Sequence, residues 1–333
     1  MANTFGTLYK VSIFGESHGK GLGVVIDGCP AGLKISEKDF IKDIERRKPG
    51  LPGTTPRIEE DHPVILSGIY EGFSTGAPIA IVFENKNIKS SDYDKLKIIP
   101  RPGHSDFVAL MKYGGFNDPR GGGHFSGRLT LGLIAAGVIA KKMIKPIKVN
   151  AFLTEAGGDV NIEKAVKKAI KEEDSIGGII RCEAEGIPAG LGEPFFDSVE
   201  SLISHAVFSV PAIKGIEFGS GFSSAAMKGS AHNDIIADKS GKTKTNFAGG
   251  INGGITNGNC VIFNVAVKPT SSIQKEQKTL NLKTGKADSL VVGGRHDVCI
   301  ALRMPVIIES VTAMVLADLM MREQKIIRIL KTR

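Results

Sequence analysis

Short runs of alternating apolar and polar residues recur along the chain, and glycine or proline closes most of them. Alternation with a period of two predicts strands over residues 5–14, 24–26, 64–66, 79–83, 148–153, 177–182, 213–218 and 260–267. Apolar residues at helical spacing predict helices over residues 36–48, 129–144, 161–171, 199–208 and 305–321. Strands and helices therefore alternate in two blocks, and the second block loosely echoes the first.

The arrangement of these elements favours one domain. No Ser/Gly-rich or charged linker divides the 333 residues, so we expect a single domain over residues 1–333. Region 219–254 is rich in glycine and has few long apolar runs, which predicts loops around a site. The apolar run 129–140 is too short to cross a bilayer, which takes about 20 residues. We therefore expect no membrane association.

Composition narrows the class of protein. Hydrophobic residues make up 41% of the chain and charged residues 23%, which are values typical of globular proteins. The first residues lack the basic and apolar stretches of a signal peptide. The four cysteines are far apart, without a CxxC pair, which favours reduced thiols and a cytoplasmic location. No two histidines are close enough to suggest a local metal motif, and we expect no metal.

The net charge of +8 favours acidic partners, which include nucleic acids, anionic membranes and anionic small molecules. Several lysines lie along the predicted helix 161–171, where they are typical of a solvated face. The chain has four tyrosines and no tryptophan, and its aromatic residues do not alternate with basic ones. This composition argues against a nucleic-acid-binding surface.

Two polar loops precede the most apolar helix, at residues 101–106 and 118–123. The first loop contains His104, and the second ends in three glycines and leads through Ser126 and Arg128 into the helix. A glycine loop that enters a helix offers free N–H groups to an anion. The same glycines are equally typical of a tight connection that needs their φ angles.

Other turns carry chemically able side chains as well. Ser17 and His18 follow the first strand, and the basic residues 46–48 end the first helix. Those cations either stabilise the helix C-terminus or clamp an anion. Residues 268–272 suit phosphate or ribityl contacts, or form an ordinary strand end. The turn 293–297 ends in an arginine, a histidine and an aspartate.

In this order, the polar segments resemble the chorismate synthase family over nearly the whole chain. The matching segments are residues 15–19, 46–50, 101–106, 118–123, 174–177, 186–194, 268–272 and 295–297. Each segment alone is a weak signal, whereas the complete ordered series is not expected by chance. The resemblance implies an α/β fold, a sandwich of antiparallel or mixed sheets and helices with internal pseudo-symmetry.

The resemblance also implies an activity. The family consists of carbon–oxygen lyases that catalyse the last step of the shikimate pathway, in aromatic amino acid biosynthesis. The substrate is 5-enolpyruvylshikimate 3-phosphate, and the products are chorismate and phosphate, formed by a 1,4-anti elimination. Reduced FMN is required although no net redox change occurs, and NADPH is an indirect reductant. The resemblance further implies a homotetramer.

Roles for individual residues follow from the resemblance. Because the substrate carries a phosphate and two carboxylates, its binding residues are expected to be cationic. The implied substrate-binding residues are Arg47, Arg101, Arg128 and Arg295, and Arg47 is also implied to contact NADP. The implied catalytic residues are Ser17, His18, His104, Ser126 and Asp297. The implied flavin contacts are His124, Phe125, Ser126, Pro211, Ala212, Gly253, Lys268, Pro269, Thr270, Ser271, Ser272 and Arg295.

Proton chemistry distinguishes these catalytic residues. A histidine titrates near neutrality, at about 6.5. His18 and His104 are therefore the expected acids, which protonate the leaving phosphate or keep the reduced flavin correctly protonated. The resemblance makes Asp297 the base partner, which relays the substrate C6 proton by way of flavin N5. Ser17 and Ser126 supply supporting hydrogen bonds.

The chain departs from the family pattern at four places. His124 stands where the family commonly has an arginine, and Pro211 stands where an asparagine is common. The family has another arginine near Gly53, and Arg57 is the candidate to replace it. Segment 153–174 is shorter than in long members. The short segment suggests the monofunctional type, which receives reduced flavin from a separate flavin reductase.

Two alternative functions are kept open. One is a flavoprotein that uses NADPH to reduce FMN, and the other is a basic nucleic-acid-binding protein. The first would reduce its bound flavin with NADPH alone. The second would bind RNA or DNA in a salt-sensitive way.

Overall fold

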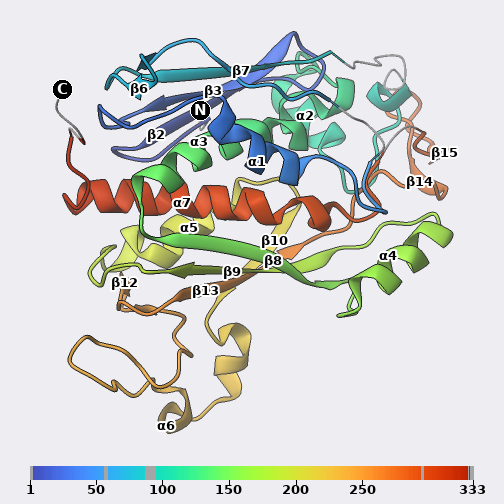
Figure 1. Ribbon diagram of the computed structural model, residues 1–333. Coiled ribbons are helices and arrows are strands. Elements are labelled where there is room, and N and C mark those ends of the chain that lie inside the picture. Colours follow the sequence, from blue (N-terminus) through green and yellow to red (C-terminus); the bar gives the residue numbers. More distant parts are fainter. Residues whose placement is uncertain (1–2, 56–58, 87–94, 294–295, 329, 331–333) are drawn as a thin grey trace.

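Two antiparallel sheets enclose two layers of helices, so that four layers are stacked in the order sheet, helices, helices, sheet (Figure 1). The computed structural model describes residues 3–55, 59–86, 95–293, 296–328 and 330. The fold is α/β, as the sequence predicts. Among the described helices, none combines the length and apolar character that a membrane crossing requires.

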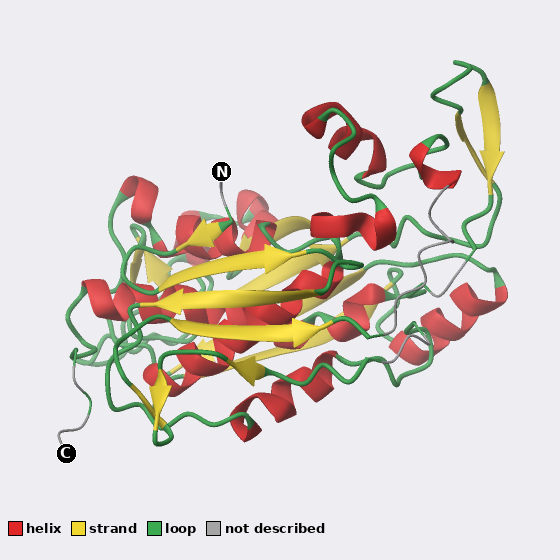
Figure 2. Cartoon of the chain, turned by 90° about the horizontal axis from the view of Figure 1, so that it is seen from above, coloured by secondary structure: helices red, strands yellow, loops and turns green. Residues whose placement is uncertain are grey.

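The first sheet contains five strands in the order β1-β2-β3-β7-β4. Val24 pairs with Ile81 in its centre, and both side chains are fully buried against the helices. Alternate residues point away from the core, which accounts for the period of two in the sequence. The strands are β1 (Thr4–Phe5), β2 (Lys10–Gly15), β3 (Gly21–Asp27), β4 (Val64–Ile65) and β7 (Ile79–Glu84). Figure 2 shows this sheet from above, crossing over the helices.

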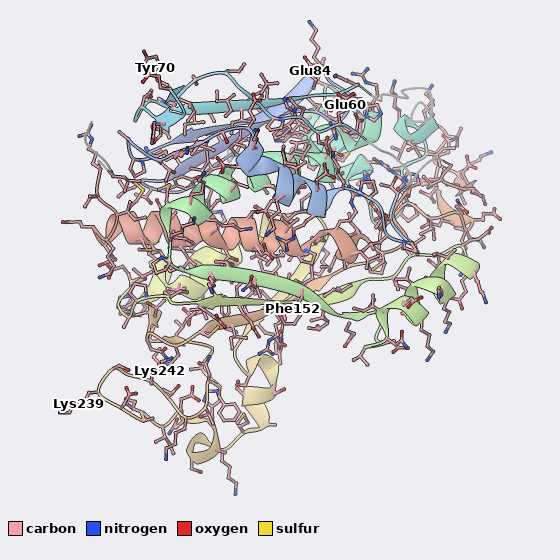
Figure 3. All side chains as sticks on the ribbon, viewed as in Figure 1. Glu60, Tyr70, Glu84, Phe152, Lys239 and Lys242 are labelled. Carbon is pink, nitrogen blue, oxygen red and sulfur yellow. The ribbon has the colours of Figure 1, made fainter. Side chains whose placement is uncertain are left out.

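The second sheet contains four strands in the order β10-β13-β9-β8. Val265 pairs with Ile180 in its centre, and both are fully buried. Phe152 lies on the outer face of this sheet and is 45% exposed (Figure 3). The strands are β8 (Lys148–Ala156), β9 (Gly178–Glu185), β10 (Ile213–Phe218) and β13 (Val261–Val267).

Four helices lie between the sheets: α1 (Lys38–Arg47), α3 (Thr130–Met143), α5 (Val199–Phe208) and α7 (Pro305–Arg322). Helices α3 and α7 are buried along most of their lengths and pack on each other. At Gly137 a Cβ atom would lie 2.3 Å from the Cβ of Ser310, so only glycine permits this close approach. This contact joins the two halves of the molecule.

The two halves have the same topology. The first runs β2–β3–α1–β4–β7–α3, and the second runs β8–β9–α5–β10–β13–α7. The corresponding sheet orders are β2-β3-β7-β4 and β8-β9-β13-β10, with all neighbours antiparallel. The internal pseudo-symmetry therefore exists at the level of topology, although no sequence repeat reveals it.

Smaller elements decorate this frame. The remaining helices are α2 (Asp106–Tyr113), α4 (Ile162–Lys171) and α6 (Gly229–His232). The 3-10 turns are η2 (Lys95–Lys97), η3 (Arg120–Phe125), η4 (Gly127–Leu129), η5 (Phe195–Asp197), η6 (Gly221–Ala226) and η7 (Ile300–Arg303). The small hairpins are β5–β6 (Ile69–Tyr70, Phe73–Ser74), β11–β12 (Ile251–Asn252, Ile255–Thr256) and β14–β15 (Gln277–Leu280, Ala287–Leu290).

The prediction of one strand over residues 5–14 is wrong, because the chain turns back between β1 and β2. Gly6 adopts a φ of 95°, which few other residues tolerate. The buried Asp318 side chain of α7 accepts hydrogen bonds from the backbone N–H groups of Thr7, Leu8 and Tyr9, at 3.0, 2.6 and 2.8 Å. A residue more than 300 positions away therefore fixes the turn.

Region 219–254, which we expected to surround a site, does not line the cleft of this chain that is described below. Much of it forms a lobe that projects from the second sheet and carries Lys239 and Lys242 at its exposed end (Figures 1 and 3). Asp234 closes the lobe by accepting hydrogen bonds from the N–H groups of Phe247 and Ala248, at 2.8 and 2.9 Å. Several glycines of the region adopt positive φ, as turns within the lobe and at its base require.

Candidate functional site

A cleft of about 750 Å³ lies where loops of both halves meet. The first half contributes residues from the β2–β3 loop, the α1–β4 loop and the β7–α3 connection. The second half contributes the α5–β10 connection and the β13–α7 connection. The α1–β4 loop corresponds to the α5–β10 connection, and the β7–α3 connection corresponds to the β13–α7 connection, so most of the cleft lies between topologically equivalent segments.

The cleft brings together most of the predicted site residues. Those that line it are Ser17, Arg47, Arg101, His104, His124, Phe125, Ser126, Arg128, Pro211, Ala212, Lys268, Pro269, Thr270, Ser271, Ser272 and Asp297. His18 and Gly253 do not line it. Arg295 and Arg57 lie outside the described residues.

Arg101, His104 and Asp106 form one hydrogen-bonded group. Arg101 donates from Nε and Nη2 to the two carboxylate oxygens of Asp106, each at 2.8 Å. His104 Nδ1 lies 2.6 Å from Asp106 Oδ1. We predicted that Asp106 lies on a loop. In the structure it is instead the first residue of α2. The sequence gives little signal for α2, because this short helix buries only Ala109.

The surroundings set the charge of this group. Burial lowers the pKa of His104, and Arg101 and Lys268 add to the effect, while the hydrogen bond to Asp106 opposes it. Burial alone would raise the pKa of Asp106, but hydrogen bonds from Arg101 and His104 outweigh it and hold that pKa well below its usual range. The carboxylate is ionised, and the imidazole of the free protein is neutral at pH 7.

Arg47 and Arg128 share the carboxylate of Asp61. Arg128 Nη1 donates to Asp61 Oδ1 at 2.7 Å, and Arg47 Nη1 lies 3.5 Å from Asp61 Oδ2. All three side chains are buried. Burial lowers the pKa of Arg47 to about 9, and the nearby cation Arg303 adds to this effect. Asp61 adopts a φ of 51°, a strained conformation of the kind that clusters at functional sites.

Asp297 also lines the cleft, near Arg47, and its carboxylate accepts hydrogen bonds from two neighbours. The backbone N–H of Thr55 donates to its Oδ1 at 2.9 Å. Arg303 Nη1 donates to Oδ1 and Oδ2 at 3.1 and 3.0 Å. Arg303 Nε also donates to the backbone carbonyl of Arg47 at 2.8 Å. The predicted base is therefore joined to the end of α1.

The three glycines of the central loop all adopt positive φ, at 59°, 82° and 53°. A Cβ atom on Gly121 would lie 2.3 Å from the His18 ring, which is buried directly behind the loop. The loop thus covers His18, whereas Ser17 reaches the cleft.

His124 and Ser126 form hydrogen bonds within the wall of the cleft. His124 Nδ1 lies 2.9 Å from the carbonyl of Gly15, and its Nε2 lies 3.2 Å from Asn3 Oδ1. Ser126 Oγ accepts from the N–H of Arg128 at 3.3 Å, which caps the turn η4. His124 thereby connects the central glycine loop to the end of β2 and to Asn3.

The segment from Lys268 to Ser272 forms a polar wall with features suited to an anionic group. Lys268 Nζ donates to Ser271 Oγ at 2.8 Å and to the carbonyl of Gly103 at 3.0 Å. Arg101 Nη1 donates to Ser272 Oγ at 3.0 Å. Thr270 Oγ1 is buried without a hydrogen-bond partner in the described part of the protein. An unsatisfied buried hydroxyl beside two cations fits a phosphate-bearing cofactor.

Gly253 lies at the other end of α5. Gly253 belongs to the turn of hairpin β11–β12. The carbonyl of its neighbour Gly254 accepts a hydrogen bond from the N–H of Val199, the first residue of α5. The cleft residues Pro211 and Ala212 follow the opposite end of the same helix. Within one chain, the structure therefore separates Gly253 from the predicted flavin contacts.

Sequence analysis did not assign several residues that line the cleft. The charged or titratable ones are Glu59, Asp61, Lys214, His296 and Arg303. Arg303 could have been found only from the topological repeat, because it precedes α7 as Arg128 precedes α3. In the described ranges, no three His, Cys, Asp or Glu side chains are grouped so as to hold a metal ion.

Comparison with known proteins was made for the whole chain. A model of the chorismate synthase family matches residues 9–321. A chorismate synthase of Chitinophaga pinensis is 62% identical over 330 residues, which cover 99% of each chain. One of Pyrococcus abyssi is 44% identical over 342 residues, covering 94% of this chain and 96% of the relative. A crystal structure of a chorismate synthase superposes with a TM-score of 0.72 at 27% identity, covering 96% of this chain and 93% of the other.

Proposed function

The chain belongs to the chorismate synthase family of carbon–oxygen lyases, and we propose that its cleft eliminates phosphate from 5-enolpyruvylshikimate 3-phosphate to give chorismate. The reaction removes a phosphate and a proton from two carbons of the substrate, with no net redox change. The observation that carries the proposal is the set of buried arginines, Arg47, Arg101 and Arg128, that faces one cleft. A substrate with one phosphate and two carboxylates needs such a set.

The arginines are ordered before the substrate arrives. Each is already bound to a carboxylate, Asp61 or Asp106, and this fixes its side chain without neutralising the whole cleft. Binding then loses less side-chain entropy than it would with free arginines. We propose that Arg101 and Arg128 contact the anionic groups of the substrate and that Arg47 supports them.

The family uses a flavin, and we propose that this flavin is reduced FMN. Its phosphate and ribityl groups would contact Lys268 and the hydroxyl groups of Thr270, Ser271 and Ser272, where the buried Thr270 Oγ1 lacks a partner among the described residues. Further contacts would come from residues 124–126 and 211–212. When bound, the reduced flavin supplies electron density for cleavage of the allylic C–O bond.

We propose that His104 and Asp297 handle the protons. His104 Nδ1 hydrogen-bonds to Asp106, which leaves Nε2 for the leaving phosphate. The bound phosphate dianion would favour protonation of the ring, so that Nε2 carries a proton that it can donate. Two hydrogen-bond donors orient the Asp297 carboxylate, which also lines the cleft, as the proton acceptor. Ser17 and Ser126 would add hydrogen bonds at the cleft wall. His18, which packs behind Gly121, is the second proposed acid.

Further expectations concern assembly and supply of the cofactor. We propose a cytoplasmic homotetramer, in which Gly253 could approach a flavin only in the cleft of another copy. The connection between β8 and β9 holds only α4 and short turns. We propose that reduced flavin comes from a separate reductase and that NADPH acts indirectly.

Anaerobic phosphate release from the substrate tests the function, with pre-reduced FMN in one arm and NADPH plus oxidised FMN in the other. We expect release only with pre-reduced FMN. Release in both arms would indicate an intrinsic reductase, and release in neither would refute the proposal.

Arg128→Ala should lower kcat/KM by about 10- to 100-fold, because a hydrogen bond to a charged group is lost. Arg181→Ala removes a cation from the second sheet, at a residue that does not line the cleft, and should leave kcat/KM unchanged.

A further inference from the structure

The topological repeat pairs two arginines at the cleft. Arg128 lies in turn η4, two residues before α3 begins at Thr130. Arg303 ends turn η7, two residues before α7 begins at Pro305. Since α3 and α7 close the two equivalent halves, Arg128 and Arg303 occupy corresponding positions.

The two arginines also make similar contacts, although their carboxylate partners lie in connections that do not correspond: Asp61 lies between α1 and β4, and Asp297 lies between β13 and α7. Arg128 holds the loop carboxylate of Asp61 at 2.7 Å. Arg303 holds the loop carboxylate of Asp297, with Nη1 at 3.1 and 3.0 Å from its two oxygens. Each guanidinium is largely buried, with 7% and 14% of the side chain exposed. Burial weakens screening by solvent, so each ion pair can fix the orientation of its carboxylate.

We propose that Arg303 is the positioning residue of Asp297. Its guanidinium contacts both carboxylate oxygens while Nε is fixed on the carbonyl of Arg47, so the carboxylate is aligned with the end of α1. The inference rests on the proposed function, in which Asp297 accepts a proton. It assigns Arg303 a role in kcat that acts through Asp297 rather than through the substrate.

Charge alone does not fulfil this role. A lysine at position 303 would keep the positive charge but would present a single flexible ammonium, which cannot reproduce the planar donor set. Misplacement of a reacting group by about 1 Å can cost about 100-fold in rate. We expect Arg303→Ala to lower kcat about 100-fold and Arg303→Lys about 10-fold, with little change in KM for the substrate.

A double-mutant cycle tests the coupling directly. Phosphate release is measured with reduced FMN for the parent, Arg303→Ala, Asp297→Ala and the double variant. If Arg303 acts through Asp297, its replacement changes kcat little once Asp297 is absent. Arg322→Ala is the control, since it removes a cation from the other end of α7, where it pairs with the half-exposed Asp197. This control should keep the parent kcat.

Chemical rescue adds a readout that a purely structural role would not give. Arg303 also lines a second cavity of about 510 Å³, beside residues 48–51. Guanidinium ions can enter the vacated position from that cavity. We expect millimolar guanidinium chloride to raise kcat of Arg303→Ala, whereas it should not raise kcat of Arg303→Lys, because the lysine side chain occupies the space.

Several results would overturn the inference. They are additive losses in the cycle, an increase in KM with unchanged kcat, or parent activity in Arg303→Ala. If Arg303→Ala does not fold, as judged by circular dichroism, the kcat of Arg303→Lys tests the role instead. A parent-like kcat in Arg303→Lys would refute the role. Failure of the parent to release phosphate would instead refute the proposed function.

Discussion

At the scale of single residues, the cleft is built from cations that already have carboxylate partners. Arg101 binds Asp106, Arg128 binds Asp61, and Arg303 binds Asp297. A buried, unpaired cation would cost several kcal/mol, so each pair makes burial of its guanidinium tolerable. The carboxylates thus keep the cationic cleft folded while no anionic ligand is bound.

Asp106 should control the titration of His104. In Asp106→Asn, the ring loses the carboxylate that opposes the effects of burial and of Arg101. The pKa of His104, already lowered in the parent, should therefore fall further. An NMR titration of the His104 ring measures this directly. An unchanged or higher midpoint in the variant would show that Asp106 does not act on the ring.

The glycine loop allows a second residue-scale test. Gly121→Ala would place a Cβ 2.3 Å from the His18 ring at a positive φ, so the loop must shift. We expect a loss of about 1–3 kcal/mol in the free energy of unfolding, together with reduced phosphate release. Gly127→Ala is the matched control, because a Cβ there meets no atom within 4 Å. Equal stability of the two variants would contradict the structural argument.

At the scale of elements, the carboxylate of one residue connects three helices and one strand by hydrogen bonds. Glu309 of α7 accepts hydrogen bonds from Arg46 of α1 at 2.7 Å and from Lys141 of α3 at 2.9 Å. It also accepts from the N–H of Ala151 in β8 at 3.0 Å. Burial opposes ionisation, but these partners outweigh it and lower the pKa of Glu309. The carboxylate therefore stabilises the junction between the halves in its ionised form.

Replacement of Glu309 should destabilise the protein in a pH-dependent way. Because the folded-state pKa is below the unfolded value of about 4.3, its contribution is present above that pH and is lost as the pH falls through the folded pKa. Glu309→Gln should lower the free energy of unfolding at pH 7 by about 2 kcal/mol. Below pH 4, the free energy of unfolding of the variant should change less with pH than that of the parent. Denaturant titrations at several pH values measure both effects.

The control for Glu309 lies on the surface. Glu163→Gln removes a carboxylate that pairs with Lys167 on the exposed face of α4. Exposed pairs of this kind are screened by solvent and contribute little to stability, so this variant should unfold like the parent. If both variants were equally stable at pH 7, the network at Glu309 would not stabilise the junction.

Periodicity in the sequence predicts most of the large elements. Helix 199–208 and strand 213–218 have the predicted bounds. The apolar residues of each follow its own period, and a turn ends each element. The β1–β2 turn could not be predicted, since its hydrogen-bond acceptor is Asp318. The pairing of Arg303 with Asp297 was missed for a related reason, because only the folded chain shows that the two halves correspond.

At the scale of the whole molecule, the halves depend on each other. Helices α3 and α7 bury nearly all their side chains, partly against one another, so neither half covers its apolar helix alone. Residues of both halves also line the cleft. The cleft therefore exists only in the joined molecule.

This dependence predicts one cooperative unfolding transition. Hydrogen exchange in β3, which reports on the first half, and in β9, which reports on the second, should show the same free energy of opening under mild denaturant. Gly137→Leu at the α3–α7 contact should lower both values together, since a larger side chain cannot fit beside Ser310. Two transitions with separate midpoints would show that the halves are independent.

The hydrogen bonds from the β1–β2 turn to Asp318 constrain the order of events during synthesis. A ribosome adds about 5–20 residues per second, so Thr7 emerges well before its partner. The earliest turn of the polypeptide must wait, without its acceptor, until the final long helix has been made. The three hydrogen bonds that fix the β1–β2 turn therefore form only after α7 has been synthesised.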